Sequence, residues 1–139
     1  RDCLLSRGLG DVYKRQVEDM TIFRAVNIRD DLKKGPAEGY RVLVDRMWPR
    51  GVKKDDARLD ERRTDLAPSS QLRTWWNHDP ERFDEFAGRY EVELDESGAA
   101  KTFLEECAGR DEVILLYGAG DREVNHAVVL ERILTELAN

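Results

Sequence analysis

Three short apolar runs without polar alternation predict strands that are buried on both faces of a sheet. They occupy residues 21–26, 41–44 and 112–117. Helical patterns separate them, and strands alternating with helices are typical of a parallel sheet. The expected fold is therefore an α/β layered sandwich with a small, mostly parallel sheet and flanking helices. Because three strands make a thin sheet, a fourth short strand is expected within residues 67–76.

Apolar residues recur at helical spacing over residues 80–96, 99–108 and 122–137. The expected buried stripe of the last helix consists of Ala127, Leu130, Leu134 and Leu137, with Val128, Val129 and Ile133 beside it. A thinner apolar face predicts a surface helix over residues 57–66. Residues 27–39 contain two Gly and one Pro, which predict a loop.

The composition excludes several classes of protein. A formal net charge of -6 does not favour non-specific binding to nucleic acid. No apolar run approaches the roughly 20 residues of a membrane span, so no membrane partner is expected. The two cysteines, Cys3 and Cys107, form no framework or metal pattern, and reduced thiols predict a cytoplasmic protein. No cofactor or metal is expected, and the oligomeric state stays open.

The first nineteen residues differ from the rest of the chain. Residues 1–19 have no steady period, mix Gly with charges and precede Met20. They look like translated vector or adapter sequence and lack the apolar core of a secretory signal. We therefore expect a non-native leader at 1–19 and a single α/β domain over 20–139.

The residues that follow the second predicted strand form a candidate anion site. Asp45, Arg46 and Arg50 lie where an open α/β sheet binds its ligands, at the carboxyl ends of the strands. A guanidinium is a fixed fork that binds carboxylate or phosphate in two-point fashion. The structural alternative is that Asp45 and Arg46 form an ion pair while Trp48 and Pro49 pack the turn.

A second group of candidate residues follows the last predicted strand. Small residues at 118–120 would let a ligand approach the backbone, and Asn125 and His126 fall in the opening turn of the next helix. His126 could act as acid or base, although a lone His at a helix start also serves as a capping or packing residue. The glycine pattern matches neither a dinucleotide fingerprint nor a P-loop.

A third group surrounds two adjacent tryptophans. Arg73 is a further candidate anion ligand, and Trp75 and Trp76 cannot both face the core from one helix. One of them is therefore expected at a surface, cleft or interface. His78 is interpreted as a turn residue. Cys107 falls among the apolar positions of a helix, which does not favour a nucleophilic role.

Three segments of the sequence together resemble one family. They are GYRVLVDRMWPRGVKKDDARLDE, LAPSSQLRTWWNHDPERFDEFAGRYEVEL and VILLYGAGDREVNHAVVLERIL. The chain thus resembles the DUF488 family of unknown function, in its YeaO-like branch, over residues 21–137. The resemblance implies signature positions at Arg24, Arg41, Asp45, Arg46, Arg50, Arg73, His78, Asn125 and His126. A related branch shows Cys-His-Arg where this chain has Asn125 and His126 without a Cys, so the resemblance implies no thiol chemistry here.

Three functional hypotheses follow from these residues. The first is an enzyme for a small phosphorylated or carboxylated substrate, with Asp45 or His126 as acid or base. Arg46, Arg50 and Arg73 would bind the anion, and Asn125 would orient it. The second is a module that binds a nucleotide or a nucleic-acid end without turnover. The third is a structural or protein-interaction domain whose arginines pair with Asp and Glu.

Overall fold

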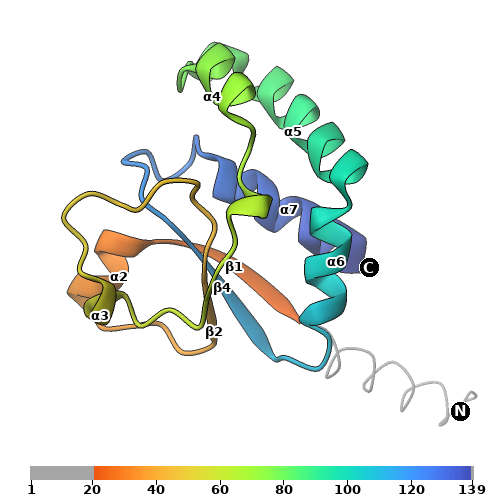
Figure 1. Ribbon diagram of the computed structural model, residues 1–139. Helices are drawn as coiled ribbons and strands as arrows, with labels where there is room; N and C mark the ends of the chain where they lie inside the picture. Colours follow the sequence, from red (N-terminus) through yellow and green to blue (C-terminus); the bar gives the residue numbers. More distant parts are fainter. Residues whose placement is uncertain (1–20, 139) are drawn as a thin grey trace, which may run out of the picture.

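The computed structural model describes residues 21–138 of the chain, and its centre is a four-stranded sheet (Figure 1). Every pair of neighbouring strands is parallel, in the order β1-β4-β2-β3. The strands are β1 (Ile22–Asn27), β2 (Tyr40–Leu43), β3 (Glu61–Arg62) and β4 (Glu112–Tyr117). The two central strands, β4 and β2, are the apolar runs that the sequence predicts to be buried on both faces.

Helices cover both faces of this sheet (Figure 1). They are α2 (Ile28–Lys34), α3 (Lys54–Ala57), α4 (Ser70–Trp76), α5 (Phe83–Ser97), α6 (Ala99–Glu106) and α7 (His126–Ala138). Two 3-10 turns, Thr64–Leu66 and Pro80–Arg82, join some of them. Helices α5, α6 and α7 lie on one face of the sheet, while α2 and α3 lie on the other (Figure 1).

The alternation of side chains along the central strands divides the core into two parts. Val113 and Leu115 pack with Phe86, Tyr90 and Leu130 on the face of α5 to α7. Their neighbours in β4, Ile114 and Leu116, point the other way and pack against Ile28 and Ala57. Because successive side chains of a strand point to opposite faces of the sheet, apolar side chains lie in both layers, which confirms the predicted α/β sandwich.

Two predicted elements are wrong. Residues 27–39 do not form only a loop, because Asn27 caps helix α2 by accepting from the amides of Arg29 (2.9 Å) and Asp30 (3.1 Å). Residues 57–66 do not form one helix. Helix α3 ends at Ala57, and Arg58 adopts a left-handed conformation with φ of 51° that turns the chain into β3.

Other boundaries also differ from the prediction. The fourth strand is β3 rather than part of residues 67–76, where Ser69 instead caps α4 by accepting from Leu72 N at 3.1 Å. Helix α7 begins at His126, four residues after the predicted start at 122. Leu137, expected in the buried stripe, is 52% exposed. The predicted helices over 80–96 and 99–108 are close to the observed α5 and α6.

Two remaining expectations concern a leader at residues 1–19 and membrane-spanning segments. The expected leader at residues 1–19 lies outside the described residues. Within residues 21–138, no helix is long and apolar enough to cross a membrane.

Candidate functional site

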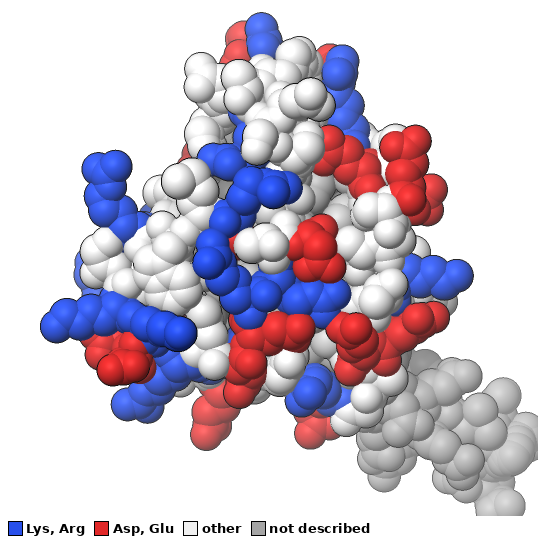
Figure 2. Space-filling view, viewed as in Figure 1, with Lys and Arg blue, Asp and Glu red and all other residues white. Residues whose placement is uncertain are grey.

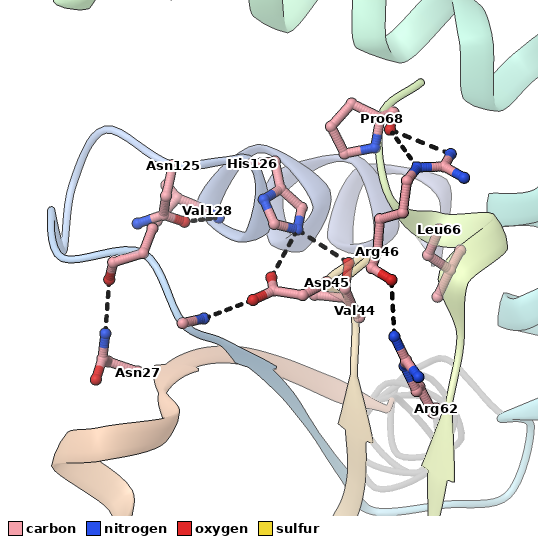
Figure 3. Close-up of polar contacts among 12 residues, drawn as sticks. Asn27, Val44, Asp45, Arg46, Arg62, Leu66, Pro68, Asn125, His126 and Val128 are labelled. Carbon is pink, nitrogen blue, oxygen red and sulfur yellow. Dashed lines mark hydrogen bonds and ion pairs between the residues drawn. The ribbon is translucent and has the colours of Figure 1, made fainter. Parts of the chain in front are cut away.

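The loops after β2 and β4 meet at the carboxyl edge of the sheet (Figure 3). The amide of Gly118 donates a hydrogen bond to Asp45 Oδ2 at 2.8 Å. A Cβ atom on Gly118 would lie 3.1 Å from this oxygen and 3.1 Å from Pro49 Cβ. The absence of a side chain at Gly118 therefore allows the two loops to touch, whereas the approach of a ligand to this backbone stays a prediction.

His126, the first residue of α7, ties this helix to the end of β2 (Figure 3). Its Nε2 lies 3.0 Å from the carbonyl oxygen of Val44 and 3.3 Å from Asp45 Oδ1. Because a carbonyl only accepts, Nε2 carries a hydrogen and donates to Val44. The ring also meets Tyr90 edge-on, with 6.2 Å between centroids. The structure thus brings together the two residues predicted to be catalytic.

Burial shifts the pKa values of this pair in opposite directions. Burial lowers the pKa of His126 below its ordinary value of 6.5, although the nearby Asp45 charge partly opposes this. Burial likewise raises the pKa of Asp45, and the His126 charge and the Gly118 hydrogen bond partly oppose that shift. Asp45 Oδ1 is buried without a hydrogen-bond partner among the described residues. Since burial disfavours both charges, the imidazole is neutral near pH 7.

Asn125 precedes helix α7 and caps it, which positions His126 (Figure 3). Its Oδ1 accepts from Val128 N at 2.9 Å, the pattern of a helix N-cap. Its Nδ2 donates to the carbonyl of Asp121 at 2.9 Å, and the residue is completely buried. Both ends of the amide are therefore engaged within the protein, while the predicted contact with a substrate stays a prediction.

The three predicted anion-binding arginines are exposed around this edge. Arg46 is held loosely, with Nε 3.4 Å and Nη2 3.3 Å from the carbonyl of Pro68 (Figure 3). Arg73 on α4 lies close enough to lower the pKa of both Asp45 and His126, an effect smaller than burial. Arg50 projects from the loop after β2. The structure places all three on elements that meet at the carboxyl edge.

These arginines differ from most others in having no carboxylate partner within the described part of the chain. The arginines that form ion pairs are Arg24, Arg41, Arg63, Arg82, Arg89, Arg122 and Arg132. Arg46, Arg50 and Arg73 take part in none of these pairs. Figure 2 shows Lys and Arg side chains on the face toward the viewer, with Asp and Glu directly beside them. Three exposed guanidinium groups without an ion-pair partner among the described residues thus lie on elements that meet at this edge.

One residue that joins the two loops carries no mark in the sequence. Arg29 donates from Nη1 to the carbonyl of Gly118 and from Nη2 to the carbonyl of Arg50, both at 2.7 Å. Its neighbour Asn27 donates to the carbonyl of Ala119 at 2.7 Å. No sequence signal marked Arg29, because its segment was expected to be a loop rather than the start of α2.

The two tryptophans face different surroundings, as their adjacency predicts. Trp76 is buried, whereas Trp75 is partly exposed and covered by the guanidinium groups of Arg89 (4.4 Å) and Arg82 (5.2 Å). His78 occupies a turn with φ of 56°, and its ring contacts that of Trp76 at an angle of 44°, with centroids 5.0 Å apart.

Cys107 lies at the opposite end of the sheet from this edge. Its carbonyl accepts from Thr21 Oγ1 at 3.3 Å, next to the first residue of β1. Burial raises the pKa of its thiol to about 11. Among residues 21–138, no group of three His, Cys, Asp or Glu is placed to hold a metal ion. The groups at the carboxyl edge are thus a half-buried Asp and His, with exposed arginines on the surrounding elements.

Comparison with known proteins places the chain among uncharacterised relatives. The family model described as "Inactive DUF488-N3 subclade" matches residues 23–139. Uncharacterized proteins of Mycobacterium tuberculosis and Mycobacterium bovis are each 44% identical over 114 residues, covering 82% of this chain and 94% of theirs. The uncharacterized protein YeaO of Escherichia coli is 38% identical over 101 residues, covering 73% of this chain and 88% of its own. No solved structure matches significantly. The chain therefore belongs to the DUF488 family, in its YeaO-like branch.

Proposed function

We propose that the protein binds a small phosphate- or carboxylate-bearing ligand at the carboxyl edge of the sheet, without turning it over. Arg46, Arg50 and Arg73 supply the charge that holds the ligand. The observation that carries the proposal is their exposure without carboxylate partners among the described residues, beside elements that meet at one edge. Exposed guanidinium groups bind such anions through charge-assisted, two-point hydrogen bonds.

Two observations favour binding over catalysis. The family model that matches the chain is described as an inactive subclade, and we infer that this chain is inactive too. Nε2 of His126 also donates to the carbonyl of Val44, so this nitrogen serves the fold. Asp45 is partly engaged as well, because its Oδ2 accepts from Gly118 N, while its Oδ1 has no hydrogen-bond partner among the described residues. In the proposal, Asp45, His126 and Asn125 position the two loops, while the arginines contact the ligand.

The unpaired arginines also argue against a purely structural domain. A structural role predicts that they form ion pairs with the abundant Asp and Glu, as Arg63 does with Asp65 and Glu106. Arg46 instead contacts only the carbonyl of Pro68 among described residues, at 3.3 and 3.4 Å. A backbone carbonyl leaves its positive charge uncompensated and available to an anion.

Thermal unfolding in the presence of inorganic pyrophosphate tests the proposal. A ligand that binds only the native state stabilises it by about 2.7 kcal/mol at 100 times Kd. Pyrophosphate should therefore raise Tm in a concentration-dependent manner, and Arg46→Ala and Arg73→Ala should each reduce the effect. Arg89→Ala is the matched control, because Arg89 is equally exposed but pairs with Glu85 on α5 at 2.5 Å.

The outcomes separate the three hypotheses. An unchanged Tm at high pyrophosphate concentration in low salt would contradict anion binding and favour a structural role. Release of product from a panel of phosphate esters, lost in His126→Ala, would contradict the absence of turnover. A shift of equal size in Arg46→Ala, Arg73→Ala and Arg89→Ala would mean that the anion binds at another place.

A further inference from the structure

We infer that the ligand of this site is a nucleotide, whose base occupies a cavity beside Trp48 while its phosphates meet the arginines. The inference rests on the proposed anion site and names its ligand class. The cavity has a volume of about 500 Å³ and lies against the loop that follows β2. Its lining consists of Trp48, Lys54, Leu59, Asp60, Glu61 and Arg62.

Trp48 offers a fixed aromatic surface in this cavity. Its Nε1 donates to the carbonyl of Val52 at 2.6 Å, and the ring packs partly on the core layer that contains Leu43. The indole is therefore held in one orientation before any ligand arrives, which reduces the entropy lost on binding. Every base has a π face, so an aromatic platform accepts bases of different identity.

Arg62 connects the cavity to the anion site. Its guanidinium carbon lies 5.8 Å from the centre of the Trp48 ring, and its Nη2 donates to the carbonyl of Arg46 at 2.7 Å (Figure 3). Trp48 stands two residues from both Arg46 and Arg50, so its Cα atom lies at most about 7 Å from theirs. In the inferred pose, the phosphate of a ligand stacked on Trp48 reaches the side chains of these arginines.

The lining of the cavity carries charges of both signs, because Lys54 and Arg62 balance Asp60 and Glu61. Both oxygens of Glu61 are engaged, by the hydroxyl of Tyr40 at 2.7 Å and by Nη1 of Arg63 at 3.2 Å. Asp60 accepts from the amide of Arg41 through Oδ2 at 2.8 Å, and its other oxygen is an acceptor for the amino group of a base. Stacking on Trp48 and this acceptor place the base in the cavity.

Comparing ADP with inorganic pyrophosphate tests the base subsite. On the wild-type protein, ADP should bind at least about tenfold more tightly than pyrophosphate, because base stacking adds to the phosphate contacts. Trp48→Ala should reduce ADP affinity to the level of pyrophosphate and leave pyrophosphate affinity unchanged. Trp48→Phe, which keeps an aromatic ring, should retain most of the ADP affinity and guards against a misfolded Trp48→Ala.

Intrinsic fluorescence supplies a second readout for the same variants. ADP should quench tryptophan emission in the wild type and in Trp75→Phe, whose altered ring lies under Arg82 and Arg89. The quenching should disappear in Trp48→Phe although ADP still binds. Pyrophosphate should cause little quenching in any variant.

The possible failures are distinguishable. Equal affinity of the wild type for ADP and pyrophosphate would overturn the base subsite and leave the anion site standing. Equal weakening of both ligands by Trp48→Ala in a folded protein would also overturn it. Absence of binding by either ligand would overturn both the inference and the proposed function.

Discussion

His126 Nε2 and the carbonyl oxygen of Val44 lie 3.0 Å apart, which ties the first residue of α7 to the end of β2 (Figure 3). The two residues are 82 positions apart in the chain. This contact passes through the middle of the candidate site, directly beside Asp45. The hydrogen bond between His126 and Val44 holds the start of α7 against the end of β2 whether or not a ligand is present.

Replacement of His126 should therefore destabilise the fold. His126→Ala removes the hydrogen bond and leaves the buried carbonyl of Val44 unpaired, which costs about 1–3 kcal/mol. Urea unfolding followed by circular dichroism measures this change. Lys101→Ala is the control, because Lys101 is exposed on α6 and its loss should change stability by only about 0.5 kcal/mol. Equal effects of the two changes would contradict the proposed tie.

The lowered pKa of His126 predicts a loss of stability in mild acid. Burial lowers this pKa in the folded state below 6.5, so the unfolded chain takes up a proton first as the pH falls. The free energy of unfolding should therefore fall from pH 6.5 downward, until the pH reaches the folded-state pKa. Urea unfolding at pH 7.5, 6.5 and 5.5 measures the slope, and His126→Gln should flatten it.

Asp45 contributes to the pH dependence of stability with the opposite sign. Burial raises its pKa above 3.8 in the folded state, so the native protein binds this proton first. The stability linked to Asp45 is fully present below pH 3.8 and is lost as the pH rises through the raised pKa.

An identical pH slope in wild type and His126→Gln between pH 6.5 and 5.5 would contradict the assignment to His126.

Gly118→Ala should also destabilise the protein. The added Cβ would lie 3.1 Å from Asp45 Oδ2 and from Pro49 Cβ, so the two loops must move apart at a cost of about 1–3 kcal/mol. Gly88→Ala is the matched control, because nothing lies within 4 Å of a Cβ atom at that position. Gly88 lies inside helix α5, where Ala should add about 0.5–1 kcal/mol of stability. Chemical denaturation of both variants should give changes of opposite sign.

The buried ion pair of Asp31 and Arg41 should be among the most sensitive sites. Their side chains are 1% and 7% exposed, and Arg41 Nη2 lies 2.6 Å from Asp31 Oδ2. Asp31→Ala leaves a buried guanidinium without its counter-charge, which costs about 3–5 kcal/mol. Glu85→Ala, which breaks the exposed pair with Arg89, should cost less than about 1 kcal/mol. A small loss for Asp31→Ala in urea would show that Arg41 is compensated by its contacts to backbone carbonyls.

Cys107 should not react with thiol reagents in the native protein. The residue is 1% exposed, and burial raises the pKa of its thiol to about 11, so little thiolate forms at pH 8. A Cys3→Ser variant isolates Cys107 for measurement with a chromogenic disulfide reagent. The reaction should be slow in buffer and fast in denaturing urea. Equal rates under the two conditions would contradict the buried position.

The sequence predicted those parts of the fold that rest on local pattern. Continuous apolar runs identified β4 and β2, because central strands of a parallel sheet are buried on both faces. Helical spacing over residues 80–96 located the region of α5. The same pattern placed Asp45 and Gly118 at one edge of the sheet, and the structure brings them into contact.

Local pattern failed where long-range contacts decide the structure. Helix α2 carries Ile28 into the second core layer, although Gly and Pro around it predicted a loop. Strand β3 has only two residues, and pairing with β2 rather than its own composition defines it. Propensity is a weak prior over such short segments, and tertiary contacts override it.

The sequence by itself determined the fold class, the family resemblance and the residue types at the candidate site. Only the tertiary structure decided their roles, because a role depends on neighbours far apart in the chain. It placed Asp45 and His126 together in a half-buried pair, engaged both ends of the Asn125 amide with the backbone, and revealed Arg29 as a link between the loops. Hydrogen-bond partners and burial arise from chain packing, which no local spacing of residues records.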